Sequence, residues 1–286
     1  MKVLPFKIPK PFDSTLVVQE DKARIFYNQL HQHAEVQISY IVQGQGKLIV
    51  ANSVYSFEAG DIYVIGSNIP HLFQSIPTKE LSHMITLFVT EESFGNDFFQ
   101  IPELEDVKKF FRTSEGGIRV LSKKKSIRRI LLELPTVDKL QAFIRFLKLV
   151  QKINGATIGE LTTFVPSKKI ISNNEGRRLQ LVFDYAMNHF DKEIKLNYVA
   201  SLVHMTTPAF CRFFKQRTNK TFFEFLIELR LEHACQLLSG NEKLSIAEIS
   251  EASGFQSISN FNRKFKKNKM ASPSQYAKKM RPEPTH

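Results

Sequence analysis

Two stretches of the chain, 195–219 and 243–269, repeat one pattern of residues. Each predicts a short helix, a turn and a second helix that carries the motif Phe-x-Arg-x-Phe. The motif residues are Phe210, Arg212 and Phe214 in the first stretch, and Phe261, Arg263 and Phe265 in the second. Phenylalanines four residues apart lie on one helix face and pack against a partner, whereas the arginine between them points elsewhere. The repeat therefore predicts two helix-turn-helix units.

The second helix of each unit has a defined start. Thr206 and Ser257 favour the N-cap position, and Pro208 suits the first turn, where its missing N–H costs least. Such a helix leaves its N-terminal half free to enter a DNA major groove, which is about 12 Å wide. The connecting segment 221–238 predicts a helix about 26 Å long, able to hold two such helices roughly one DNA turn apart. The alternative is a plain bundle of amphipathic helices, which a tandem of two basic units disfavours.

The charge of the chain is unevenly distributed. Residues 1–110 contain 9 Lys and Arg against 13 Asp and Glu, residues 111–172 contain 13 against 4, and residues 173–286 contain 18 against 11. This distribution indicates that only the later part of the chain meets a polyanion. The two cysteines, Cys211 and Cys235, have no metal or redox spacing. We find no signal segment and no apolar run of about 18 residues, so we expect a cytoplasmic protein without a membrane partner.

The repeats resemble the double helix-turn-helix domain of AraC/XylS-type transcriptional regulators over about 176–281. The resemblance rests on Phe210-Cys211-Arg212-Phe213-Phe214-Lys215, Phe225-Leu226, Leu229-Arg230-Leu231-Glu232, Ala234-Cys235, Leu237-Leu238, Ile246-Ala247-Glu248-Ile249, Gly254-Phe255, Phe261-Asn262-Arg263-Lys264-Phe265-Lys266-Lys267 and Ser272-Pro273-Ser274-Gln275-Tyr276. It implies a sequence-specific DNA-binding transcriptional regulator, more commonly an activator than a repressor. Its implied partners are double-stranded promoter DNA, RNA polymerase and a second copy of the chain in a homodimer.

The resemblance also implies which side chains meet DNA. Those assigned to base edges are Pro208, Cys211, Arg212, Ile258, Ser259, Asn262 and Arg263. Arginine can read guanine with two hydrogen bonds and asparagine can read adenine, whereas proline, cysteine and isoleucine would read shape or a thymine methyl. Those assigned to phosphates are Thr206, Lys215, Arg217, Ser257, Lys264, Lys266 and Lys267. Phosphate contacts position the protein without specifying sequence, and they weaken with salt.

Two positions depart from the family pattern. Asn219 stands where glycine is usual after the first recognition helix, and asparagine also tolerates the left-handed conformation. Lys269 and Met270 stand where an aromatic residue followed by glycine is usual. The second departure puts the C-terminal end of the second recognition helix in doubt.

The first part of the chain, from about Leu16 to Thr90, predicts short strands separated by turns, as in a small barrel or sandwich. It contains HQHAEVQ, residues 31–37, and about 30 residues later GDIYVIGSNIPH, which ends at His71. These stretches resemble the two motifs of cupin barrels, which several AraC/XylS-type regulators carry as sensor domains. The residues that fit the pattern, besides the histidines below, are Gly44, Gly60, Asp61 and Pro70.

In metal-dependent cupins two histidines, a glutamate and a later histidine bind the metal. His31, His33 and His71 match the histidines, but the glutamate position holds Gln37 or Ile38, and Glu35 has a different spacing. Three histidines can still bind a transition metal, although the missing carboxylate argues against catalysis. The same polar stripe also suits a small-molecule pocket, lined by Arg24, Tyr27, His31, His33, Glu35, Gln37 and His71. A third interpretation places these side chains on a solvent-facing sheet.

We therefore expect an α+β chain with three parts: a cupin-like ligand-sensing barrel at 1–95, a helical linker or dimerisation region at 96–172, and a DNA-binding domain at 173–286. Its expected function is transcriptional regulation in response to a small molecule, by resemblance a sugar, and not catalysis. The competing hypothesis is a metal-dependent cupin enzyme with an accessory helical domain. A helical interaction module without a DNA role is the third.

Overall fold

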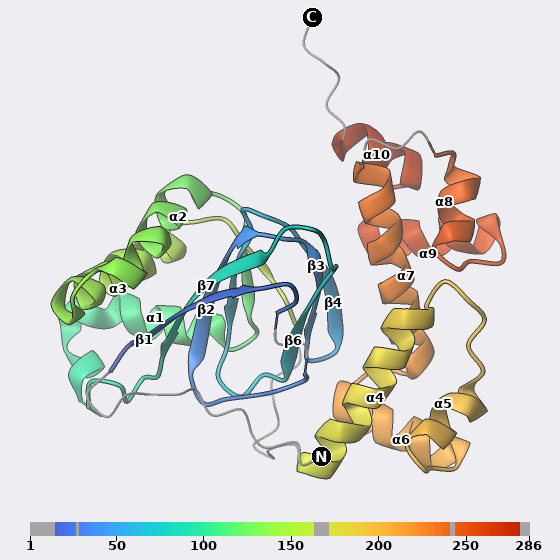
Figure 1. Cartoon of the computed structure of the whole chain (residues 1–286), viewed down its shortest axis with the longest axis horizontal. Coiled ribbons are helices and arrows are strands. Elements are labelled where there is room, and N and C mark those ends of the chain that lie inside the picture. The colour runs from blue at the N-terminus through green and yellow to red at the C-terminus, as the bar shows by residue number, and fades with distance from the viewer. Residues whose placement is uncertain (1–14, 27–28, 96, 163–171, 241–243, 281–286) are drawn as a thin grey trace, which may run out of the picture. The chain divides into compact units, whose positions relative to one another are not determined.

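The computed structural model describes residues 15–26, 29–95, 97–162, 172–240 and 244–280 (Figure 1). The chain divides near residue 176 into two compact units, the first rich in strands and the second helical. The α+β class predicted from the sequence is therefore confirmed. Within these ranges no helix has the length and apolar character needed to cross a membrane.

The N-terminal unit contains two sheets. Its strands are β1 (Val17–Ala23), β2 (Val36–Gln43), β3 (Gly46–Val50), β4 (Ser53–Phe57), β5 (Ile62–Ile65), β6 (His71–Ser75), β7 (Ser82–Val89), β8 (Ile118–Val120) and β9 (Ile158–Glu160). One sheet has the order β1-β7-β2-β5-β8-β9 and the other has the order β4-β3-β6. The pairings of β2 with β5 and β7 are antiparallel, which places β2 in the middle of the larger sheet.

Three helices cover one face of the larger sheet (Figure 1). They are α1 (Glu105–Ser114), α2 (Lys124–Glu133) and α3 (Lys139–Asn154), accompanied by 3-10 turns at Phe98–Gln100, Pro102–Leu104 and Leu134–Thr136. Ile38 and Tyr40 of β2 pack into the core that these helices share with the sheet. Gln37 and Ser39 alternate with them, so they point to the opposite face of β2, and both are buried. The central strand therefore has an apolar side and a polar side.

Residues 97–162 contain the helices α1, α2 and α3, and also two strands that we did not predict. β8 pairs with β5 and β9 pairs with β8, so this region extends the larger sheet. Both strands have only three residues, too few for a period-two pattern to stand out in the sequence. The segment is therefore part of the N-terminal unit's sheet as well as its helical layer.

A buried carboxylate joins the sheet to this region. Asp61, which precedes β5 and is 2% exposed, accepts hydrogen bonds at 2.9 Å from the Arg119 guanidinium of β8 and from Lys124 Nζ of α2. The Tyr63 hydroxyl donates to the same carboxylate at 3.1 Å. Three side chains thus donate to the carboxylate of Asp61, which the sequence indicated only as part of a motif.

The C-terminal unit is entirely helical in its described residues. Its helices are α4 (Asn173–His189), α5 (Leu196–Leu202), α6 (Thr207–Thr218), α7 (Phe222–Ser239), α8 (Ile246–Ala252), α9 (Ile258–Lys269) and α10 (Pro273–Met280). The repeat and its connecting segment predicted α5 to α9. α7 runs from the first helix pair, α5 and α6, to the second, α8 and α9 (Figure 1).

The phenylalanines of the repeat form the cores of the two helix pairs. Phe210 and Phe214 are fully buried, and the Phe214 ring contacts Phe225 of α7 at a centroid distance of 5.9 Å. Phe261 and Phe265 are likewise fully buried, in a cluster with residues of the second half of α7. The same motif therefore attaches each second helix to α7, as the spacing predicts.

The end of α9 is well defined, which removes the doubt raised by Lys269 and Met270. Met270 adopts the left-handed conformation with φ 55°, as Asn219 does with φ 54° after α6. The two recognition helices therefore end in the same way. Methionine carries the steric cost of this conformation, about 1–2 kcal/mol, which glycine would avoid.

Candidate DNA-binding surface and ligand-binding site

The helices α6 and α9 present one exposed face each. Every side chain that we predicted to read bases is exposed: Pro208, Cys211, Arg212, Ile258, Ser259, Asn262 and Arg263. Arg212 and Arg263 lie opposite the buried phenylalanines because two residues, about 200° of helix, separate each arginine from them. Both faces are therefore free to meet a ligand as large as a duplex.

The starts of the two helices differ in one detail. Thr206 and Ser257 both occupy the N-cap position in extended conformation, as predicted. The Ser257 hydroxyl accepts a hydrogen bond from the Asn260 amide at 3.4 Å, whereas the Thr206 side chain makes no capping bond. Asn260 also accepts a hydrogen bond from Arg263 Nη2 at 2.9 Å through its side-chain oxygen. This contact holds the guanidinium against the exposed face of α9, and the sequence did not reveal it.

The side chains assigned to phosphates surround these faces. Thr206, Lys215, Ser257, Lys266 and Lys267 are exposed, whereas Arg217 and Lys264 are half-buried. The exposed lysines can follow a phosphate backbone without fixed geometry, because an ammonium group acts as a point charge.

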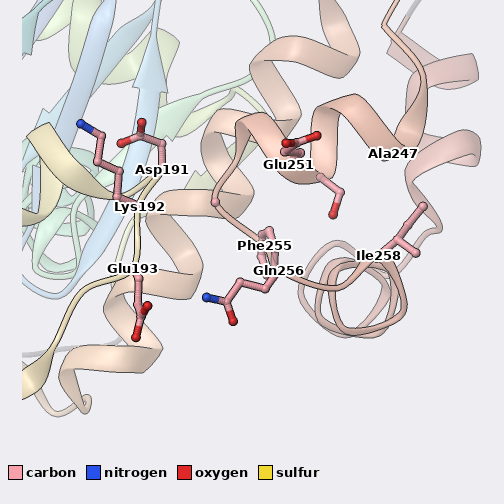
Figure 2. A pocket seen from close by; sticks show the side chains of 10 residues that line it. Asp191, Lys192, Glu193, Ala247, Glu251, Phe255, Gln256 and Ile258 are labelled. Atoms are coloured by element: carbon pink, nitrogen blue, oxygen red, sulfur yellow. The ribbon is translucent and has the colours of Figure 1, made fainter.

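An acidic groove of about 530 Å³ lies beside the start of α9 (Figure 2). Asp191 and Glu193 come from the connection between α4 and α5, and Glu251 comes from the end of α8. Lys192 and Ile258, one of the side chains assigned to base edges, also line it, so the groove borders the exposed face of α9.

In the N-terminal unit, His31, His33 and His71 form a cluster. Backbone hydrogen bonds in both directions, of 3.1 and 2.9 Å, join His31 to His71 and bring two distant segments together. One ring nitrogen from each of the three histidines lies within 4.8 Å of the others. Burial keeps the pKa of all three imidazoles below the ordinary value, that of His31 at about 4. The three rings are therefore neutral at physiological pH.

The backbone fixes the tautomer of each histidine in the cluster. Each Nδ1–H donates to a main-chain carbonyl oxygen, leaving Nε2 with its lone pair toward the other rings. The accepting oxygens belong to Gln29, Glu35 and Ile69, at 2.7, 2.9 and 2.7 Å. Hydrogen bonds of this kind orient histidines around metals.

Gln37 completes the cluster from β2. Its Oε1 lies 3.0 Å from Nε2 of both His33 and His71. A carbonyl oxygen and two unprotonated ring nitrogens all carry lone pairs, which repel one another at this distance. Two arrangements remove the repulsion. Either the amide turns its NH₂ group toward the rings and accepts from the Ser39 hydroxyl, or a cation lies among the donors. The 3.0 Å spacing is that of neighbouring ligands around a metal with bonds of about 2.1 Å. The donor set therefore fits a first-row transition metal.

Of the other side chains predicted for this pocket, Glu35 and Arg24 have different positions. Glu35 lies on the outer side of His33, with a carboxylate oxygen 3.7 Å from Nδ1 rather than near Nε2. β2 begins only at Val36, so His31 to Glu35 are not regular strand and Glu35 is not part of the polar stripe that we predicted. Arg24 is exposed. Tyr27 lies outside the described residues.

Comparison with known proteins identifies both units. A model described as an AraC-like ligand binding domain matches residues 16–109, and one described as a helix-turn-helix domain matches residues 199–279. The chain is similar to the Msm operon regulatory protein of Streptococcus mutans, with 24% identity over 85% of this chain and 84% of that protein. It is also similar to the probable transcriptional regulator LumQ of Photobacterium leiognathi, with 23% identity over 90% and 93%.

Among solved structures, the C-terminal domain of AraT, a response regulator from Geobacillus stearothermophilus, is 29% identical to this chain. It covers 41% of this chain and 95% of the solved one, with a TM-score of 0.36. The matched domains are those of regulators, and their order is ligand-binding domain first and helix-turn-helix domain second. The chain is therefore a transcriptional regulator of the AraC family.

Proposed function

We propose that the protein reads a specific operator with α6 and α9 in two successive major grooves and changes its regulatory state when a small molecule binds in the N-terminal barrel. The observation that carries the DNA part is the pair of exposed faces on helices anchored to one rod, α7. As a regulator that meets promoter DNA and RNA polymerase, it acts in the cytoplasm, as an activator. Coupling requires the effector to favour one arrangement of the protein over another.

The first test is selection of bound genomic fragments, followed by affinity measurements at several salt concentrations. Specific binding with a salt-dependent affinity is expected, because the assigned lysines release counterions from phosphates. Equal affinity for selected and random DNA contradicts the proposal. Transcription in vitro with purified RNA polymerase then determines the sign of regulation.

Within such an operator, Arg263 and Lys267 should behave differently. Replacing Arg263 with alanine should cost about 1–3 kcal/mol and relax the base preference at one position. Replacing Lys267 with alanine should weaken binding to all sequences alike and reduce the salt slope by about one. Competition binding against a library of single-base operator variants distinguishes the two. Identical profiles for both variants mean that our division into base and phosphate contacts is wrong.

We infer that the protein works as a homodimer through the helical layer of the N-terminal unit. Leu140 of α3 is 66% exposed and Leu132 of α2 is 37% exposed, so each helix presents an apolar side chain that a second copy of the chain would cover. Sedimentation of the full chain at micromolar concentration tests this inference.

Two classes of effector suit the barrel, and we propose that neither is chemically converted there. A sugar, which the family resemblance suggests, would find a buried polar row: Gln37 Nε2 donates to the Ser39 hydroxyl at 2.9 Å, and Ser39 lies 3.1 Å from the Thr86 hydroxyl. Thermal-shift measurements with a panel of sugars test this class. A screen for substrate turnover tests whether the barrel is a sensor rather than an enzyme.

The second class is a divalent transition metal, favoured by the convergence of His31, His33, His71 and Gln37. Cobalt(II) added to metal-stripped protein should give a one-to-one absorption change that His71→Ala abolishes. Gln37→Glu should increase the affinity, because a carboxylate is a stronger ligand than an amide. His83→Ala is the control, since His83 pairs with Glu20 away from the cluster. If wild type and His71→Ala respond alike, the cluster holds no metal and the amide orientation of Gln37 alone satisfies it.

A further inference from the structure

The helix α7 carries charged, half-buried side chains that reach beyond the helix itself. Glu228, Arg230 and Glu232 are all half-buried, on a helix whose other face is an apolar core. Each contacts a segment outside α7, and these segments come from both helix-turn-helix units. Charged side chains in such positions need partners, because partial burial removes water from them.

Glu228 holds the end of the first recognition helix. Lys220 follows Asn219, the left-handed residue that ends α6, and its Nζ lies 2.7 and 2.8 Å from the two carboxylate oxygens of Glu228. The two side chains are 23% and 27% exposed. This two-oxygen contact fixes where the chain leaves α6 relative to α7.

Glu232 holds the end of the second recognition helix, one helical turn further along α7. Lys269, the last residue of α9, forms a hydrogen-bonded ion pair with it. Their side chains are 25% and 14% exposed, so this pair is at least as well shielded from water as the first. Lys269 belongs to the departure from the family pattern that the sequence showed without explanation.

The two contacts are not copies of each other. When the phenylalanines of the repeat are aligned, Lys269 corresponds to Thr218, and Lys220 corresponds to Ala271. One lysine precedes the left-handed residue and the other follows it. The duplicated sequence therefore does not explain why both recognition helices end on a lysine paired with α7.

Arg230, between the two glutamates, adds a third tie. It donates to the main-chain oxygens of Phe190 and Lys192 at 2.7 and 2.8 Å, in the connection that leads into the first unit. Its guanidinium also lies 5.9 Å from the ring centre of Phe255, in the turn of the second unit. One side chain therefore contacts both the segment that leads into the first unit and the turn of the second.

The charges depend on one another. Glu228 and Glu232 are four residues apart on one helix, where like charges repel unless cations separate them. Burial raises the pKa of Glu228, and the charge of Glu232 adds to this effect while Lys220 opposes it. Burial lowers the pKa of Lys269, but Glu232 more than restores it, so that the pKa lies above the ordinary value. Each lysine thus permits the two carboxylates to remain ionised together.

We propose that Glu228 and Glu232 are positioning residues that clamp the ends of the two recognition helices to α7. They thereby set the spacing that the protein accepts between two half-sites, which are the DNA segments read by α6 and by α9. The inference rests on the proposed reading of DNA by α6 and α9. The clamp residues do not touch DNA. They act by fixing how far each helix can rotate on its phenylalanine core, and one base pair of extra spacing turns a half-site by about 35°.

The experiment measures spacing preference rather than affinity alone. Operators selected with the wild-type protein are lengthened or shortened by one base pair between half-sites, and the affinity ratio is measured for each variant. Wild type should prefer the native spacing by about tenfold or more, and Glu232→Gln should reduce that preference to about two- to threefold. Glu232→Gln should bind a single half-site as wild type does. The exchange of Glu232→Lys with Lys269→Glu should restore the preference.

Controls separate the clamp from general effects. Glu193→Gln removes the same charge from an exposed residue of the same unit and should leave the preference unchanged. Circular dichroism confirms that each variant is folded. If the variant lowers affinity for all spacings equally, or if the double variant Glu228→Gln/Glu232→Gln keeps the wild-type preference, the clamp is wrong. If wild type itself binds no DNA specifically, the proposed function has failed instead.

Discussion

Replacing Asp61 with asparagine is expected to lower the free energy of unfolding of the N-terminal unit by about 3 kcal/mol, because it leaves two cations beside a neutral amide. Arg119 and Lys124 both bond to this carboxylate, and they are only 32% and 36% exposed. Water can replace part of the lost interaction, which keeps the expected value at the low end of the range for buried pairs. Hydrogen exchange measured by mass spectrometry in denaturant can assign the loss to this unit.

The same carboxylate predicts a dependence on pH. Burial alone would raise the pKa of Asp61, but Arg119 and Lys124 overcome this effect and lower it below the ordinary value. A group whose pKa is lower in the folded state contributes stability at neutral pH and loses it as pH falls through the folded pKa. The difference in unfolding free energy between wild type and Asp61→Asn should therefore shrink on acidification.

Glu105→Gln is the matched control. Glu105 also pairs with two cations, Lys108 at 3.5 Å and Arg112 at 3.0 Å, but it is 61% exposed. An exposed pair contributes about 0–1 kcal/mol, so this variant should differ little from wild type. Equal losses for Asp61→Asn and Glu105→Gln would mean that burial does not determine the contribution of the carboxylate.

The helical part of the fold could be predicted because its signals are local. The spacing of Phe210 and Phe214, and of Phe261 and Phe265, predicts that each pair shares one helix face. The structure buries all four. The exposed faces of α6 and α9 followed from the same argument. What spacing could not give is a contact between distant residues, such as Lys269 with Glu232 or Asp61 with Arg119. Nothing in the local pattern distinguishes those lysines and arginines from solvated ones.

The histidine cluster could be predicted only in part, because the motif does not specify the path of the backbone between its residues. Its histidines were found by motif, but a polar stripe that includes Glu35 requires a regular strand from His31 onward, whereas β2 starts at Val36. That irregular entry turns Glu35 away and leaves Gln37 as the side chain that meets the rings. The Gln37 amide therefore occupies the place of the usual carboxylate because of where β2 begins, which the motif does not specify.

Gly254→Ala is expected to destabilise the second helix-turn-helix unit by about 3 kcal/mol, from a left-handed backbone and a steric clash together. Gly254 has φ +78°, and a Cβ atom there would lie 2.4 Å from the Phe190 oxygen and 3.0 Å from Arg230 Nε. Both neighbours belong to the contact through which Arg230 joins the units. Affinity for a two-half-site operator should also fall, because the clash displaces the turn that leads into α9.

Backbone strain alone does not account for so large an effect. His204 occupies the turn of the first unit with φ 54°, so a side chain at positive φ is tolerated in this domain. The decisive term is the clash with main-chain atoms, which cannot rotate away as the end of a long side chain can. Gly240→Ala is the control in the same unit, because its φ is −70° and the nearest atom to an added Cβ lies at 3.4 Å. Chemical unfolding and operator binding of both variants decide the matter: if Gly254→Ala matches Gly240→Ala in both measurements, the close approach of the turn to Phe190 does not position α9.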